Sequence, residues 1–529
     1  MPYSIAVRGR YADRCMPRSL RLFQFAIATS LMVCTLLFLV WSIRWPLVGD
    51  ASLLHYIGFL IEHGMAPYRV VNDVDMPGAF LIEIAMMHIF GPGALALRVF
   101  DFTLLAVAAV SFAILTRRSG WFPAVFAATM FALVHGRDGL EQAGQRDLTM
   151  AVLLVSGTAA LMIAVRHRSI AAMGLFGLVA GVALSIKPTA IPLSLAELLI
   201  AAHALRKQGV RLSKPLTAAG CCAVLFPTVA AAFVVQQHAA GALWADLHGV
   251  IPYYASLGHR PFSFLLTHSV SPVMALVLVW FAVIALTRPP VDWERAMLLT
   301  GVGFGLLSYF LQARGFPYHR YPLLAFLLPT MALDFTDALA RLRSTHPPQK
   351  IAAGLAVTAL AVGGFFLGPQ SAVLVHRYRW WETDFNTTLE QNLNRLGGGR
   401  LSGHVQCIDS VSGCSTSLYN LRLLPATGIL LDFPLFGIAS QPAVQQARAD
   451  FRHKVFEHPP QVIIVTSPLH IDGPGDFRKL ALWPELPGFL ARSYSLDTDW
   501  HPTRTRRWWS REELGPSYRI YVLKAEPAN

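Results

Sequence analysis

The sequence predicts an α-helical polytopic membrane protein with a small α/β domain at its carboxyl end. Charged residues make up only 14% of the 529 residues and hydrophobic residues 54%, whereas soluble domains carry about 25% charged residues. Apolar runs near the length that spans a bilayer, about 20 residues, recur up to about residue 369 and do not occur after it. We expect eleven spans, at about 22–44, 95–116, 121–136, 148–165, 170–186, 189–205, 216–236, 266–287, 296–312, 322–340 and 350–368.

Lysine and arginine residues set the predicted orientation of these spans, because cytoplasmic loops carry an excess of both. With the amino terminus in the cytoplasm, the basic clusters between spans all face inward: Arg117 with Arg118, Arg166 with Arg168, 206–214, Arg288, and Arg341 with Arg343. The chain then consists of a cytoplasmic basic tail (1–21), a transmembrane domain (22–369) and an extracytoplasmic carboxyl-terminal domain (370–529). We expect the inner (plasma) membrane as its location.

The connection at Lys187-Pro188 is compatible with two topologies. Proline removes a backbone donor and disfavours helix in the residue before it, which suits the tip of a hairpin between two spans. A single broken helix would instead reverse every later span and place the later basic loops on the wrong side of the membrane. The charge distribution therefore favours the hairpin and eleven spans.

The last 160 or so residues form a separate domain in this interpretation. Two stretches, 462–465 and 518–523, have the apolar and β-branched composition of strands, and the segment is long enough to bury a core of its own. Cys407 and Cys414 lie in it, seven residues apart. They would pair in an oxidising compartment, or remain two free thiols.

The first outward loop, 46–94, carries the acidic residue of greatest interest. Leu53, Leu54 and Ile57 begin an apolar pattern at helical spacing, and Asp50 comes just before it. Asp50 has two interpretations, which are compatible with each other. It is the N-cap of the loop helix, or it is a carboxylate that acts as a general base.

Further along the same loop, Pro67-Tyr68 precedes an acidic pair, Asp73 and Asp75. In an extended segment alternate residues point to the same side, so both acids could face one site. Pro77 is expected to open a second loop helix, because proline is favoured in the first turn. For both acids the alternative is a solvated turn with no catalytic role.

The second outward loop, 135–147, ends with Arg146-Asp147 at the start of the fourth span. A charge at a membrane boundary is costly and is commonly paired or functional. The alternatives are an Arg–Asp pair that only caps the helix, or part of an active site.

Basic residues should avoid outward loops, so those that remain there are informative. A single one would be explained as a boundary residue that reaches water. Together, from several loops at one membrane face, they predict a site for a phosphate or pyrophosphate attached to a lipid. The set is Arg137, Arg146, Lys187, Arg260, Arg314 and Arg320.

Among the outward loops, the segment 312–321 has the densest set of basic and aromatic residues. Its Tyr318 and Tyr321 either position a ligand or belong to an interfacial aromatic belt.

Because the basic residues cluster at the ends of apolar segments, they do not suggest nucleic acid binding. No cofactor is expected with certainty. The histidines near the outward loop 237–265 match no metal motif, but a divalent ion shared between one of them and a loop carboxylate stays an alternative.

An acid after the first span, an amphipathic loop helix, a Pro-Tyr pair and an acid-x-Pro element follow one another along this chain. This ordered set resembles the GT-C superfamily of polytopic glycosyltransferases, over roughly residues 20–340. The likeness is greatest to protein O-mannosyltransferases, aminoarabinose transferases and lipopolysaccharide galacturonosyltransferases. The resemblance implies an enzyme that takes a sugar from a polyprenyl-phosphate carrier and transfers it, with inversion, to an acceptor in the cell envelope, either a lipid, a glycan or a protein.

By position, Asp50 matches the acid that acts as catalytic base, and Asp75-Met76-Pro77 matches an acid-Lys-Pro element. Arg146-Asp147, Lys187-Pro188 and Arg320-Tyr321 resemble three later elements of the pattern. Met76 is a departure, because several relatives have a phosphate-binding lysine there. The phosphate contact is therefore expected from four other residues: Arg146, Lys187, Arg314 or Arg320.

The resemblance assigns catalytic roles to Asp50, Asp75 and Asp147, and donor or acceptor positioning to Tyr68, Tyr318 and Tyr321.

Two other functions are compatible with a polytopic chain rich in outward arginines. One is an O-antigen type polymerase or ligase, although such proteins rely on a loop between late spans. The other is a transporter or flippase of lipid-linked sugars, which would predict inverted repeats that the sequence does not show. A non-catalytic scaffold would leave the acidic loops unexplained.

Overall fold

The computed structural model describes residues 17–378, 384–469, 476–502, 506–508, 511–513 and 516–525, so most of the predicted basic tail lies outside the described residues. The chain divides into two compact units. Unit 1 consists of Met1–Pro46, Met86–Ala230 and His259–Trp381. Unit 2 consists of Leu47–Ala85, Ala231–Gly258 and Glu382–Asn529.

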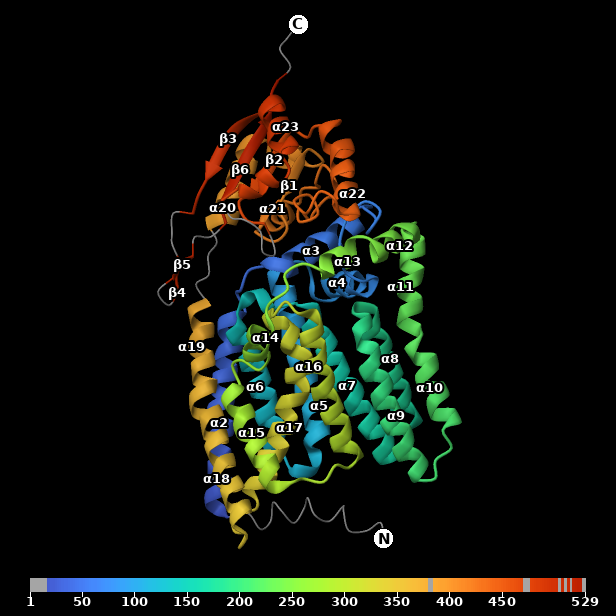
Figure 1. Cartoon of the computed structure of the whole chain (residues 1–529), viewed down its shortest axis with the longest axis vertical. Helices are drawn as coiled ribbons and strands as arrows, with labels where there is room; N and C mark the ends of the chain where they lie inside the picture. Colours follow the sequence, from blue (N-terminus) through green and yellow to red (C-terminus); the bar gives the residue numbers. More distant parts are fainter. Residues whose placement is uncertain are drawn as a thin grey trace. The chain divides into compact units, whose positions relative to one another are not determined.

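Unit 1 is a bundle of long apolar helices (Figure 1). Each of the eleven apolar segments predicted from the sequence is helical, two of them with a break. The helices are α2 (Arg18–Ser42), α5 (Ala94–Thr116), α6 (Phe122–Asp138), α7 (Arg146–His167), α8 (Ile170–Ile186), α9 (Ile191–Lys207), α10 (Ser213–Ala223), α11 (Leu225–Gln236), α14 (Phe262–Ser269), α15 (Met274–Thr287), α16 (Trp293–Gln312), α17 (Tyr321–Leu339), α18 (Pro347–Val362) and α19 (Gly368–Tyr378).

Seven helical segments among the described residues are long and apolar enough to cross a membrane, and α14 with α15, bent by 79°, would make an eighth. Two shorter helices in the described part of the chain are also apolar, Pro77–Phe90 with 14 residues and α8 with 17. The chain is therefore a multi-pass membrane protein. Its helical spans satisfy their own backbone hydrogen bonds, as the apolar interior of a bilayer demands. The exact number of spans stays a prediction.

The hairpin at Lys187-Pro188 is confirmed. Lys187 ends α8 in an extended conformation, and Pro188 opens the short turn before α9. Lys187 contacts Asp147 at the start of α7, while the Thr158 hydroxyl, further along α7, donates to Glu197 of α9 at 2.7 Å. Helix α9 therefore runs in the same direction as α7 and antiparallel to α8. It does not continue α8.

Close approach of backbones holds α8 against α10. A Cβ on Gly177 would lie 2.0 Å from the carbonyl oxygen of Ala219, and one on Gly181 would lie 2.3 Å from that of Ala223. Small residues four apart on both helices allow this distance, as in other membrane helix pairs. Direct backbone packing therefore fixes α8 against α10.

Unit 2 contains the predicted α/β domain. Its four-stranded sheet has the order β1 (Val405–Ile408), β2 (Val462–Thr466), β6 (Tyr518–Leu523) and β3 (Tyr494–Trp500), in which β1 and β2 are parallel and the other pairs antiparallel. A separate pair is formed by β4 (Arg506–Trp508) and β5 (Arg511–Glu513). The helices are α20 (Asp384–Leu396), α21 (Cys414–Asn420), α22 (Pro442–Phe451) and α23 (Glu485–Ser493).

Cys407 of β1 and Cys414 of α21 form a disulfide. Of the two alternatives left by the sequence, the structure therefore has the pairing. A disulfide agrees with the predicted extracytoplasmic side of this domain, where oxidising conditions prevail.

Most of the first outward loop, Leu47–Ala85, belongs to unit 2. The loop contains helices α3 (Gly49–Glu62) and α4 (Pro77–Phe90), and Pro77 opens α4 as predicted. The later segment adds α12 (Ala240–His248) and α13 (Val250–Ala255). The Tyr56 hydroxyl donates to the carbonyl of Leu423 at 2.9 Å, and the Leu430 amide donates to the side chain of Asn72 at 2.7 Å. Residues of the carboxyl-terminal domain therefore fix the conformation of this loop.

Candidate functional site

One end of unit 1 collects most of the polar residues that the sequence singled out. We call it the polar end of unit 1, and it consists of residues 98–101, 135–147, 187 and 314–321. Helix α7 packs against α5, α8, α9 and α17, and α16 packs against α17. The chain reverses between successive helices, so the turns that carry these residues lie at the same end of the bundle (Figure 1).

Asp147 and Lys187 form a close ion pair at this end. The Lys187 Nζ lies 2.6 Å from Asp147 Oδ2, with the Asp147 side chain 2% exposed and that of Lys187 24% exposed. Asp147 lies in the first turn of α7, where the helix dipole favours a carboxylate. An ammonium group has three donors, so Lys187 can hold Asp147 and still donate to a bound anion.

The second carboxylate oxygen of Asp147, Oδ1, is buried and has no hydrogen-bond partner among the described residues. Buried polar atoms are normally paired. A hydroxyl or amide donor would satisfy this oxygen.

Arg320 is held differently from Lys187. Its guanidinium is buried and donates to Asp138 Oδ2 at 2.5 Å, to the carbonyls of Pro317 and His268 at 3.1 and 3.4 Å, and to the carbonyl of Ser271. These contacts join the end of α6 to the break between α14 and α15. Arg320 thus fixes the shape of the polar end with donors that a phosphate would otherwise use.

Tyr321, next to Arg320, takes part in a buried chain of hydrogen bonds. Its hydroxyl lies 2.6 Å from His135 Nδ1, and His135 Nε2 lies 2.9 Å from Asp101 Oδ2. Arg98 lies 3.9 Å from the same carboxylate and stacks over the ring of Trp45. The chain joins α17, α6 and α5, and all its members are almost fully buried.

The sequence did not assign roles to His135, Arg98 and Asp138. The available signal was position: each lies within a few residues of a predicted span boundary, where a charged or polar side chain is costly without a partner. Asp101, near the start of the expected span 95–116, gives the same signal. What the sequence could not show is which of them face each other.

Arg314, Tyr318 and Arg146 complete the polar end of unit 1. Arg314 is buried and follows the last turn of α16, and Tyr318 is half-buried beside His319, with ring centroids 4.7 Å apart. Arg146 is half-buried at the first position of α7. The seven residues predicted from late and middle loops are thus all on this end.

The three remaining predicted residues, Asp50, Tyr68 and Asp75, lie in unit 2. Asp50 is half-buried in the first turn of α3, whose N-cap is Val48 without a side-chain hydrogen bond. The interpretation of Asp50 as the N-cap is therefore wrong. Its carboxylate still benefits from the positive end of the helix dipole.

Tyr68 lies among three carboxylates of unit 2. Its hydroxyl donates to the backbone carbonyl of Asp75 at 2.7 Å. Burial, together with the charges of Asp73, Asp75 and Asp246, raises the pKa of Tyr68 well above its usual range. Burial also raises the pKa of Asp246 to about 6. Tyr68 therefore stays a protonated donor, and Asp246 is a titratable group that the sequence did not reveal.

His55 and Glu83 form a further buried pair in unit 2, with Nδ1 and Oε1 2.5 Å apart. The ring of His55 also packs edge-on against Tyr419 of α21. The pair joins α3 to α4, so it holds together the two helices on either side of Tyr68 and Asp75. Within the described ranges, no three His, Cys, Asp or Glu side chains are grouped so that they could hold a metal ion.

Two solved membrane proteins have a fold similar to that of this chain. The chain is similar in structure to ArnT from Cupriavidus metallidurans, solved both in the apo state and bound to undecaprenyl phosphate, with a TM-score of 0.58 and 13% identity over 93% of this chain and 97% of that chain. It is also similar to the oligosaccharyltransferase of Archaeoglobus fulgidus, with a TM-score of 0.50 and 12% identity over 93% of this chain and 73% of that one.

No protein-family model matches the chain, and no curated protein matches it in sequence. The likeness is thus one of fold, and it extends through both units. At 12–13% identity these solved structures show that the chain shares their fold, and such a fold is what the resemblance in the sequence implied.

Proposed function

We propose that the protein is a membrane glycosyltransferase that transfers a sugar from a polyprenyl-phosphate carrier to an extracytoplasmic acceptor, namely a lipid, glycan or protein of the cell envelope. The observation that carries the proposal is the Asp147–Lys187 pair at the polar end of unit 1, in a chain with this fold. A buried carboxylate that orients a partly exposed lysine suits a leaving phosphate, because preorganised charge stabilises the charge that develops in the transition state.

In the proposed reaction an acceptor hydroxyl attacks the anomeric carbon of the sugar. The bond between that carbon and the phosphate oxygen breaks, and its electron pair leaves with the polyprenyl phosphate. The acceptor proton goes to a carboxylate, for which we propose Asp50, on the strength of its place at the start of α3. One displacement inverts the anomeric configuration.

The remaining residues have supporting roles in this proposal. Lys187, with Arg146 and Arg314, binds the phosphate, which compensates for the absence of a lysine at Met76. Asp147 orients Lys187. Arg320 acts as a positioning residue, because its donors are engaged by Asp138 and backbone carbonyls.

We assign Asp75 and Tyr68 to the neighbourhood of the acceptor, and Tyr318 and Tyr321 to the polar end of unit 1. Tyr68 remains protonated and its hydroxyl is directed at the backbone of Asp75. Tyr321 is buried and positions α17 through His135, whereas Tyr318 is half-buried and able to contact a ligand.

A lipid-linked donor is supported by the solved complex of ArnT with undecaprenyl phosphate. The test uses the purified full chain in proteoliposomes with a panel of undecaprenyl-phosphate sugars and an envelope extract as acceptor. We expect release of undecaprenyl phosphate together with a labelled acceptor. Passage of the intact lipid-linked sugar across the bilayer without release would support the flippase alternative. Turnover only with nucleotide sugars would contradict the proposed donor class.

A further inference from the structure

A small cavity lies between α7, α8, α9 and α10 of unit 1, at the helix ends opposite to the polar end. Its volume is about 180 Å³, and it is lined by Ala164, Arg168, Ser169, Ile170, Met173, Leu205, Val210, Arg211, Lys214 and Pro215. We call it the basic cavity. The proposed transfer reaction uses none of these residues.

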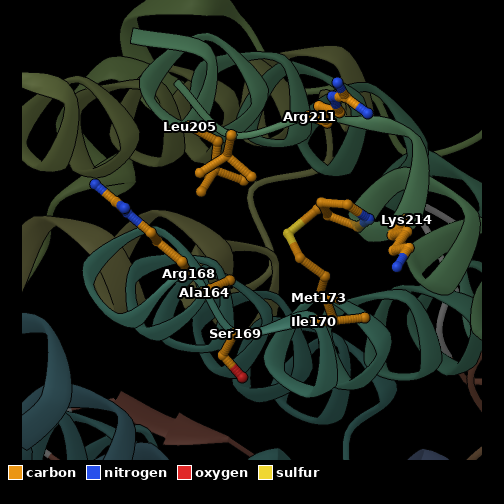
Figure 2. Close-up of a pocket in the computed structure, with 10 residues that line it drawn as sticks. Ala164, Arg168, Ser169, Ile170, Met173, Leu205, Arg211 and Lys214 are labelled. Atoms are coloured by element: carbon orange, nitrogen blue, oxygen red, sulfur yellow. The ribbon is translucent and has the colours of Figure 1, made fainter. Parts of the chain in front are cut away.

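Three cations stand around an apolar floor in this cavity. Figure 2 shows Arg168 on one side and Arg211 and Lys214 on the other. Met173 and Leu205, which line the cavity between them, are 1% and 2% exposed. The three cationic side chains are exposed, so their charged ends are accessible while the cavity below them is apolar.

The positive charge here is not neutralised by the protein. No Asp or Glu occurs in the sequence between Glu197 and Asp246. Arg168 donates to the side-chain oxygen of Gln208 at 3.4 Å. Among the described residues, Arg211 and Lys214 have no carboxylate within ion-pair distance. By contrast, Arg166, two residues from the cavity, pairs with Glu294 at 2.9 Å.

Two helices also begin at the cavity. The first residue of α8 is Ile170, and α10 starts at Ser213 with an N-cap, Leu212, that offers no side-chain hydrogen bond. Helix starts carry partial positive charge, which attracts anions; at α8 the Ser169 side chain accepts from the Ala172 amide, whereas the N-cap of α10 makes no such bond. Both helix starts add to the field of the three cations, and the close packing of Gly177 on Ala219 holds both helices in place.

We infer that the basic cavity binds the phosphate headgroup of an anionic phospholipid. The cations and helix starts match the phosphate, and the apolar floor matches the glycerol and the first acyl carbons. Basic residues gather at this end of the helices, as they do at the cytoplasmic leaflet, where anionic headgroups are recognised by basic pockets between spans. Ile170, which lines the cavity and is 46% exposed, extends the apolar surface outward for an acyl chain. The inference does not depend on the proposed transfer reaction.

A matched pair of variants tests this. The double variant Arg211→Gln with Lys214→Gln removes two cations that line the cavity. The control, Arg206→Gln with Lys207→Gln, removes the same two residue types from the last turn of α9, at exposed positions that do not line the cavity. A third variant, Ile170→Trp, keeps every charge and fills the rim of the cavity.

The measurement is native mass spectrometry of the full-length protein after extraction from vesicles that contain phosphatidylglycerol and phosphatidylcholine. We expect the wild type and the control to retain phosphatidylglycerol. The cavity double variant should retain at most about one tenth of the phosphatidylglycerol that the wild type retains. Ile170→Trp should also lose this lipid. Thermal unfolding of each variant establishes that the protein is folded.

Four results would overturn the inference. Equal loss of phosphatidylglycerol in the control would mean a diffuse field without a site, and unchanged retention in the double variant would mean that the cations are not involved. Equal retention of phosphatidylcholine by the wild type would mean apolar binding alone. Binding of inorganic phosphate by the lipid-free protein, at the strength of the lipid, would assign the cavity to a soluble phosphate instead.

Discussion

Lys187 reaches from the turn between α8 and α9 to a carboxylate at the start of α7. The pair is costly to bury, and breaking it by removing one partner leaves an uncompensated charge, commonly at about 3–5 kcal/mol. If Lys187 only stabilises the fold, replacing both partners should restore stability and sugar transfer together. If Lys187 binds the phosphate, the double replacement should restore stability alone.

The variant Lys187→Met should lower the free energy of unfolding by about 3 kcal/mol, because Asp147 then stays buried without its partner. Adding Asp147→Asn should restore most of that stability but none of the sugar transfer. Thermal unfolding and the transfer assay measure the two quantities separately. Recovery of transfer along with stability would show that Lys187 has only a structural role.

Asp246 provides a pH-dependent effect in unit 2. Burial raises its pKa from 3.8 to about 6, so between these values the folded protein binds the proton more tightly than the unfolded chain, and stability falls as the pH rises through this window. Asp246→Asn should therefore unfold at a higher temperature than the wild type above about pH 6, with the difference fading toward about pH 4. The same difference at both ends would contradict the raised pKa.

At the scale of elements, the contact between α8 and α10 is the tightest constraint on the basic cavity. A Cβ on Gly177 would meet the backbone of Ala219 at 2.0 Å, whereas one on Gly220, in the middle of α10, would meet nothing within 4 Å. The two glycines thus form a matched pair in which helix propensity changes equally and only the packing differs.

Gly177→Val should separate α8 from α10 and destabilise the protein by about 1–3 kcal/mol, the usual cost of overpacking. Gly220→Val should have little effect. Thermal unfolding in detergent compares them directly. If both variants lose the same stability, the effect would come from helix propensity and not from the contact.

In unit 2, one glycine lies at a close contact between the first outward loop and the carboxyl-terminal domain. A Cβ on Gly428 would lie 1.8 Å from the carbonyl oxygen of Val70, whereas Gly399 has open space around its Cβ position. Gly428→Ala should shift the segment that holds Tyr68 and Asp75 and reduce sugar transfer, and Gly399→Ala should not. Measuring transfer and limited proteolysis of both variants tests this, and full activity of Gly428→Ala would contradict the role of that contact.

At the scale of the whole molecule, the sequence predicted the membrane helices well because the bilayer imposes a simple rule. Spans must be apolar and helical, and arginine and lysine report the side of each loop. The same rule identified most of the polar end of unit 1, since basic residues in outward loops are unusual. The strands of unit 2 were visible as short β-branched runs such as 462–465.

The contacts that organise the site were not predictable. The Asp101–His135–Tyr321 chain depends on the rotation of three helices about their axes, which hydropathy does not determine. The hydrogen bond from Tyr56 to Leu423 joins residues 367 positions apart, and no local pattern indicates such pairing. Asp50 was predicted with two roles, and its role as N-cap is excluded by the structure, in which Val48 is the N-cap of α3.

The most direct test of the proposed chemistry is the rate of sugar transfer by Asp50→Asn in proteoliposomes supplied with the undecaprenyl-phosphate sugar that the wild type uses. We expect transfer to fall by about a hundredfold or more, the usual contribution of a general base, while the variant still folds and binds undecaprenyl phosphate as the wild type does. Transfer at the wild-type rate by a folded variant would contradict the assignment of Asp50 as the catalytic base.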